Sequence, residues 1–158
     1  MIFGKRWSEY IRFQQVILGL ILVVGLAKLA LTLAGLPNST TKWLSITVLG
    51  LLGLVYYGVR VHTAGFGSYK QLLPLLFNQN LLANAIVIIG IVIGIVTGHD
   101  NVFTAPEYSG GGDGKTWGHV GAHVVFAIFV GTLLGWLIAS IILWVTKRVA
   151  RRPASAVV

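Results

Sequence analysis

The apolar residues of this chain gather in four long stretches, at about residues 13–36, 43–61, 81–98 and 118–146. Each comes close to the roughly 20 apolar residues that a helix needs to cross a hydrocarbon core of about 30 Å. Only helices and closed barrels satisfy their backbone hydrogen bonds in lipid, and no stretch has the period-2 alternation of a barrel strand. The pattern predicts an all-α integral membrane protein, with one four-helix transmembrane domain over residues 1–158.

The basic residues between these stretches predict how the helices are oriented, because cytoplasmic loops are enriched in Lys and Arg. Basic residues precede the first stretch, separate the second from the third, and follow the fourth. The other side has two lysines, Lys42 and Lys115, and three of the four acidic residues. We therefore expect both termini in the cytoplasm, an outer loop over residues 99–117, and a basic cytoplasmic tail over residues 147–158 that meets anionic lipid headgroups.

The connection between the second and third stretches contains a shorter apolar segment at residues 69–77. It is interrupted by Pro74 and followed by Asn78, Gln79 and Asn80. The segment is too short to span a bilayer, so we expect it to lie in the cytoplasmic interface. A re-entrant turn is the alternative.

The composition excludes several classes of function. Charged residues make up 10% of the chain, against about 25% in soluble domains. The net charge of +8 sits in short clusters beside the spans, which indicates topology rather than nucleic-acid binding. Residues 109–116 nearly match a phosphate-binding loop, but they follow no strand, so no nucleotide is expected. We expect Thr116 instead to be the N-cap of the fourth span. We expect a multi-pass protein of a bacterial inner membrane, with membrane lipid as its first partner.

Small residues recur at steps of four in the third and fourth stretches, where they let helix backbones approach closely in lipid. They are Gly90, Gly94 and Gly98 in the third stretch, and Ala127, Gly131, Gly135 and Ala139 in the fourth. One interpretation is that these two faces join the third and fourth spans within one subunit. The other is a contact in a homo-oligomer or with other membrane subunits.

Lys28 is the one charged residue well inside a predicted span, in the outer half of the first stretch. A charge in hydrocarbon is expensive and is usually paired or functional. Its long stem could instead carry the ammonium to the outer headgroups. Both interpretations remain open at this point.

Three histidines fall near the outer ends of the third and fourth stretches. His99 follows the third, and His119 and His123 begin the fourth, four residues apart on one helix face. Imidazole and carboxylate ligands suit Zn, Cu, Fe or Mn, so His99, His119, His123 and Asp100 form a candidate site for a divalent transition metal. One b-type haem between His99 and His119 or His123 is the alternative cofactor. Interfacial hydrogen bonding and a proton-responsive cluster are the remaining interpretations.

The segment Gly19–Leu29, with the sequence GLILVVGLAKL, resembles the first span of the DoxX-like four-helix membrane proteins, in which a glycine-rich helix reaches a lysine near its outer end. The resemblance is confined to the first stretch, and we transfer no function from it.

The sequence favours a small oligomeric membrane protein, or a membrane subunit of a larger complex, with a candidate metal site on its outer face. One alternative is a haem- or metal-binding redox protein that uses the three histidines. The other is an oligomeric channel or transporter, which needs polar groups along an internal pathway. An enzyme is not expected, because no nucleophile, base and orienting acid gather in one place.

Overall fold

The computed structural model describes residues 1–150, and this part of the chain is helical with no β-strand. Four helical segments are long and apolar enough to cross a membrane, which confirms the predicted fold class. The first is α1 (Trp7–Leu33). The second joins the short α2 (Asn38–Thr41) to α3 (Ile46–Thr63), and the third is α4 (Tyr69–Thr97). The fourth runs without a break through α5 (Trp117–Ala122), η2 (His123–Val130) and α6 (Gly131–Val149).

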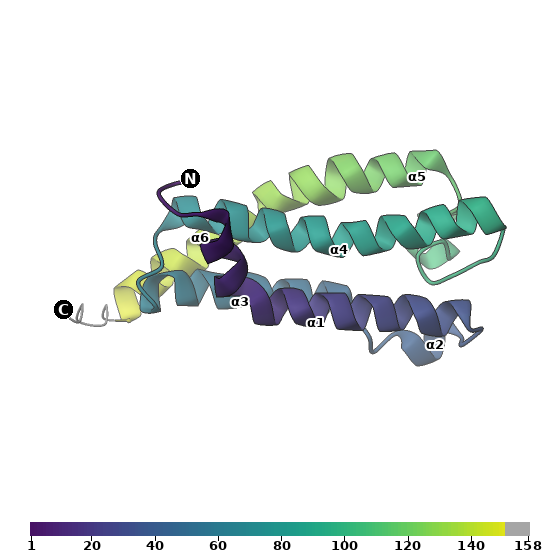
Figure 1. Ribbon diagram of the computed structural model, residues 1–158, viewed down its shortest axis with the longest axis horizontal. Helices are drawn as coiled ribbons and strands as arrows, with labels where there is room; N and C mark the ends of the chain where they lie inside the picture. Colours follow the sequence, from purple (N-terminus) through teal and green to yellow (C-terminus); the bar gives the residue numbers. More distant parts are fainter. Residues whose placement is uncertain (151–158) are drawn as a thin grey trace.

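The N-terminus and the end of α6 lie at the same end of the bundle (Figure 1), as an even number of crossings requires. We call this the terminal end. The opposite end, which we call the loop end, carries α2 and the loop of residues 98–116, with its short 3₁₀ turn η1 (Pro106–Tyr108). The cytoplasmic position of the terminal end stays a prediction. Most of the predicted basic tail, residues 151–158, lies outside the described residues.

Helix α4 begins twelve residues earlier than the third predicted span, because the apolar segment at 69–77 is continuous with it. The Ser68 backbone N–H donates to Gln71 Oε1 at 2.8 Å and caps the new start. Leu72 and Leu75 are fully buried in the bundle. At about 1.5 Å per residue, α4 is roughly 43 Å long and exceeds a hydrocarbon core of about 30 Å. Its first turns therefore reach interfacial depth, but they pack against helices rather than resting on lipid.

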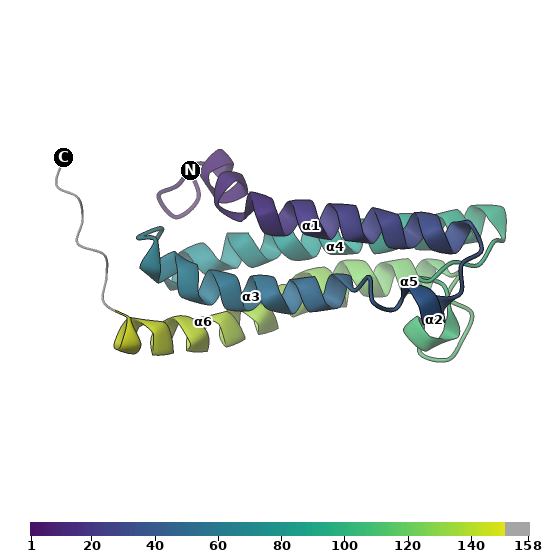
Figure 2. The same cartoon turned by 90° about the horizontal axis from the view of Figure 1, so that it is seen from below.

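The fourth span packs differently along its length. Its second half, α6, contacts both α3 and α4, whereas in the described residues α5 and η2 contact α4 but neither α1 nor α3. Figure 1 shows α5 beside α4, and Figure 2 shows α6 running along α3. The first half of the fourth span therefore diverges from α3 toward the loop end.

The terminal end is filled by large side chains. Its core includes Tyr10, Tyr57, Leu72 and Leu143, all fully buried. Gly58 lets α3 approach α6 closely, since a Cβ there would lie 2.7 Å from Ile142 and 3.2 Å from the Ala139 carbonyl oxygen. Close packing of this kind replaces the hydrophobic drive that is missing between helices in lipid.

The small-residue face of α4 accommodates the loop rather than the fourth span. A Cβ at Gly90 would lie 2.5 Å from Phe103, and one at Gly94 would lie 2.7 Å from Thr104. The loop turns inward here, and residues 101–105 are buried. Asn101 Nδ2 donates to the Gly90 carbonyl at 2.8 Å. The prediction that the glycines of the third span join the small residues of the fourth is therefore wrong.

Candidate functional site

A chain of polar contacts runs from the loop end into the middle of the bundle. His119 Nδ1 lies 2.9 Å from the Gly114 carbonyl oxygen, and its Nε2 lies 3.2 Å from Nε2 of His123. His123 Nδ1 then contacts Asn84 Oδ1 at 2.8 Å. Asn84 Nδ2 donates to the Asn80 carbonyl at 2.9 Å, and Asn80 Nδ2 donates to Thr132 Oγ1 at 3.1 Å. Helix α4 and the fourth span are thus joined by polar side chains over several turns.

The winding of the fourth span places these side chains on one face. In a regular α-helix, nine residues turn through about 900°, so His123 and Thr132 would point in opposite directions. Residues 123–130 instead form a π-helix, in which the Gly131 N–H reaches back to the Phe126 carbonyl. Wider π turns rotate less per residue, so both side chains face α4. Such segments are frequent at functional sites.

The local start of the fourth span follows from its sequence. Thr116 Oγ1 accepts a hydrogen bond from the His119 backbone N–H at 3.1 Å, so Thr116 is the N-cap. This confirms the cap predicted from the sequence. The cap fixes the first turn and with it the direction of His119.

A cavity of about 500 Å³ lies where the fourth span diverges from α3. Its apolar wall includes Leu51 and Leu134, which are 59% and 56% exposed, so the cavity opens sideways toward the surrounding lipid. Val102 and Phe103 of the inward-turned loop cover its loop end. Eight polar side chains also line it: Lys28, Lys42, Ser45, Thr47, Gln79, Asn80, Asn84 and His123.

The two lysines that line this cavity lie toward its loop end. Lys28 lies near the end of α1, Lys42 follows α2, and Ser45 is the N-cap of α3. Toward the middle of the bundle, Leu54, Leu76 and Ile138 line it beside the amides of Gln79 and Asn80. Lys28 is 7% exposed and lines the cavity. The charged side chains of the cavity therefore lie at its loop end, and its deeper part is lined by apolar and amide side chains.

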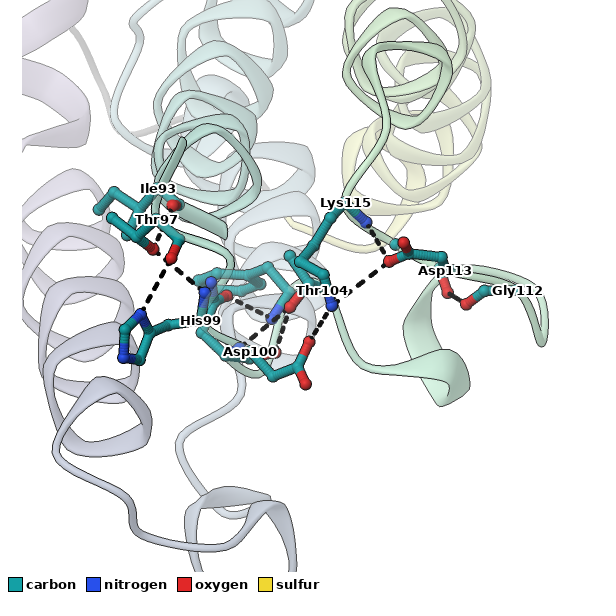
Figure 3. Close-up of polar contacts among 12 residues, drawn as sticks. Ile93, Thr97, His99, Asp100, Thr104, Gly112, Asp113 and Lys115 are labelled. Carbon is teal, nitrogen blue, oxygen red and sulfur yellow. Dashed lines mark hydrogen bonds and ion pairs between the residues drawn. The ribbon is translucent and has the colours of Figure 1, made fainter. Parts of the chain in front are cut away.

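His99 and Asp100, the other two predicted metal ligands, lie elsewhere at the loop end (Figure 3). His99 is exposed, and its Nδ1 contacts the Thr97 carbonyl oxygen at 3.2 Å. Asp100 accepts a hydrogen bond from Lys115 Nζ, which also lies 3.5 Å from Asp113 Oδ1. Within residues 1–150, no three His, Asp or Glu side chains form a group that could hold a metal ion. The structure brings His119 and His123 together, but not with His99 or Asp100.

The carboxylates of the loop are held by Lys115 instead. The Lys115 backbone N–H donates to Asp113 Oδ1 at 2.9 Å, and this bond is the main reason why the pKa of Asp113 is lowered. The hydrogen bond that Lys115 donates to Asp100 is the main reason why the pKa of Lys115 is raised. Glu107 accepts a hydrogen bond from Asn38 Nδ2 at 3.4 Å. These contacts shape the loop rather than a ligand shell.

Sequence reasoning missed the roles of Gln79 and Asn80 in α4. Gln79 and Asn80 were assigned to the end of an interfacial segment, although Asn80 and Asn84 are four residues apart and therefore share a helix face. Gln79 is 3% exposed, and its Nε2 donates to the Gly50 carbonyl at 3.0 Å. The spacing of Asn80 and Asn84 was the available signal.

The fold and the site together define a class: an all-helical chain with four helices able to cross a membrane, and a side-opening, partly polar cavity between α3, α4 and α6. No protein-family model, curated protein or solved structure matches this chain.

Proposed function

We propose that the protein is a small, non-catalytic membrane protein that binds one anionic lipid in the cavity between α3, α4 and α6. The observation that carries this proposal is the arrangement of the lining. Lys28, Lys42 and Ser45 lie at the loop end, and Leu54, Leu76 and Ile138 lie deeper. A lipid headgroup at the loop end and an acyl chain directed toward the middle of the bilayer match this order.

The size and charge of the cavity support the same ligand. A volume of about 500 Å³ lies within the usual range of ligand pockets, about 300–1,000 Å³. Two lysines and no Asp or Glu of the described residues line it, so a phosphate or carboxylate head is favoured over a cationic one. The sideways opening provides an entry path for a molecule that already resides in the bilayer.

The sequence also predicted an oligomer, a larger complex and a bacterial inner membrane. Gly90 and Gly94 of α4 are occupied by the loop, so the proposal does not rely on self-association through them. Membership in a larger complex and location in a bacterial inner membrane remain predictions. The mass of the purified complex, measured on the samples used below, tests the oligomeric state.

Lipid retention tests the proposal. The protein is purified in detergent, mixed with equal amounts of phosphatidylglycerol and phosphatidylcholine, and weighed intact by native mass spectrometry. We expect one retained lipid per chain, with phosphatidylglycerol preferred severalfold. Gly135→Phe should abolish retention, because Gly135 lines the cavity and a Cβ there has only ordinary contacts, the nearest at 3.7 Å.

Two further variants separate the cavity from other effects. Gly19→Phe is the matched control, since Gly19 is exposed on α1 with nothing within 4 Å of its Cβ position, and it should retain lipid normally. Lys42→Gln should reduce the preference for the anionic lipid. Equal retention by Gly135→Phe and Gly19→Phe would refute the cavity as the site, and equal retention of the two lipids would refute the anionic headgroup.

A further inference from the structure

The hydrogen-bond partners of His119 and His123 assign the protons on both rings. His119 Nδ1 faces the Gly114 carbonyl oxygen, which can only accept, so Nδ1 carries the hydrogen. His123 Nδ1 faces Asn84 Oδ1, which also only accepts, so this Nδ1 carries a hydrogen too. The Asn84 amide cannot be reversed without loss, because its Nδ2 donates to the Asn80 carbonyl.

This assignment leaves the two Nε2 atoms as acceptors that face each other at 3.2 Å. A neutral imidazole has one hydrogen, and both rings use theirs at Nδ1. Two lone pairs at this distance repel each other unless a cation lies between them. The pair is therefore a two-nitrogen donor set that a shared cation, either a proton or a metal ion, can bridge.

We propose that Nε2 of His119 and Nε2 of His123 together bind one divalent transition-metal ion of the zinc type, at the edge of the cavity. Zinc bonds to histidine nitrogen at about 2.0–2.1 Å. Two nitrogens 3.2 Å apart then subtend about 100° at the ion, which is close to a tetrahedral angle. This proposal goes beyond lipid binding and does not depend on it.

The surroundings of the pair match those of metal-binding histidines. Such histidines almost always donate their second ring N–H to a carbonyl, a carboxylate or water, which fixes the ring and its tautomer. Here the Gly114 carbonyl and Asn84 Oδ1 accept these two hydrogens. Asn84 is a positioning residue, held in turn by the Asn80 carbonyl. His123 lines the cavity, where water or a bound oxygen ligand has room to complete the coordination shell.

The proposal narrows the donor set that the sequence suggested. Of His99, His119, His123 and Asp100, only the middle two face each other. His99 and Asp100 are engaged by Thr97 and Lys115. Removing the side chain of His99 or of Asp100 should therefore leave the affinity for zinc unchanged.

Metal titration of the purified protein tests the proposal. The chain is prepared in detergent with an affinity tag that lacks histidine, stripped with a chelator, and titrated with Zn²⁺ by calorimetry and with Co²⁺ by visible absorption. We expect one ion per chain, with tetrahedral-type Co²⁺ absorption that is displaced by Zn²⁺. His119→Ala and His123→Ala should each reduce the affinity at least tenfold, while His99→Ala and His62→Ala should not change it.

Asn84→Leu keeps the test valid if a histidine variant fails to fold. It removes the acceptor for His123 Nδ1 but no ligand, so one ion should still bind, with an affinity about 10–100-fold weaker. Helical content measured by circular dichroism checks folding in each variant. An equal loss of affinity in His99→Ala would overturn the proposal. The proposal would also be overturned if the wild type binds no Zn²⁺ and nitrogen NMR of the metal-free protein shows an imidazolium at this pair.

Discussion

The two ends of the bundle treat buried polar groups in opposite ways. At the terminal end, Gln14, Tyr57 and Asn78 are buried, and within residues 1–150 their side-chain polar atoms have no hydrogen-bond partner. From the middle of the bundle toward the loop end, Asn80, Asn84 and the two histidines of the fourth span form a connected chain of polar contacts. The terminal end is close-packed, whereas the loop end holds a cavity of about 500 Å³.

This difference indicates that the terminal end contributes packing and that the region around the cavity is the candidate binding site. Unpartnered polar groups in a close-packed core reduce stability. Beside the cavity, the side-chain amides of Asn80 and Asn84 each donate to a partner, and a few placed polar groups of this kind orient a ligand in an otherwise apolar pocket. The comparison can be tested by substitutions that act on one end only.

The largest effect is expected from Gly58→Val, which disturbs the packing of the terminal end. The new Cβ would lie 2.7 Å from Ile142 and 3.2 Å from the Ala139 carbonyl oxygen. A backbone atom cannot move aside as a side chain can, so α3 and α6 must separate. Overpacking of this kind typically costs about 1–3 kcal/mol. Unfolding in detergent, followed by circular dichroism, measures the loss.

Gly19→Val is the matched control for this substitution. Gly19 also lies within a membrane-spanning helix, but it is exposed and has nothing within 4 Å of its Cβ position. Its stability should change little. If the two variants unfold under the same conditions, the close approach of α3 and α6 is wrong.

Local sequence patterns predicted some features of the fold and misplaced others. Apolar length predicted four spans, and the capping residue Thr116 was identified from its position before an apolar run. These features depend on neighbouring residues, so the sequence shows them directly. The start of α4 was misplaced because Pro74 and the amides after it are typical of a helix end.

The site at the loop end depends on features that no local pattern reveals. Residues 123–130 have an ordinary apolar sequence, yet their π winding brings Thr132 onto the face of His123. Val102 and Phe103 lie in a loop flanked by polar residues, and their burial against α4 follows from the space at Gly90. Steps of four residues therefore predicted the His119–His123 pair, but they also led to the wrong partner for the glycines of α4.

A smaller effect, of opposite sign, is expected from Gln14→Leu at the terminal end. Gln14 is fully buried, and both its amide atoms lack partners among the described residues. Leucine has a similar volume and no polar atoms, so the substitution should stabilise the fold by about 1 kcal/mol. The same unfolding measurement applies. Gln15→Leu is the control, because Gln15 is exposed on the same helix.

The corresponding substitution in the connected chain, Asn80→Leu, should instead lower the stability of the fold. Asn80→Leu removes the hydrogen bond to Thr132, and hydrogen bonds between membrane helices contribute about 0.6 kcal/mol on average. A loss of stability in Gln14→Leu would contradict the comparison, since it would mean that the buried amide has a partner, such as an internal water molecule.

The smallest effect is expected at the exposed charges of the loop. The pKa of Asp113 is lowered first by the Lys115 backbone N–H and then by the Lys115 ammonium. A lowered carboxyl pKa stabilises the folded loop above the ordinary value of 3.8, and this contribution is lost as the pH falls through the folded-state pKa. The raised pKa of Lys115 acts in the opposite sense, so its contribution to stability is present below pH 10.5 and is lost as the pH rises through the higher folded-state pKa.

Carboxyl-carbon NMR of Asp113 measures the lowered pKa of this carboxyl group. In Lys115→Gln the pKa of Asp113 should rise only part of the way, because the backbone donor remains, whereas Lys42→Gln should leave it unchanged. A complete return to the ordinary value in Lys115→Gln would show that the ammonium, rather than the backbone turn, holds this carboxylate.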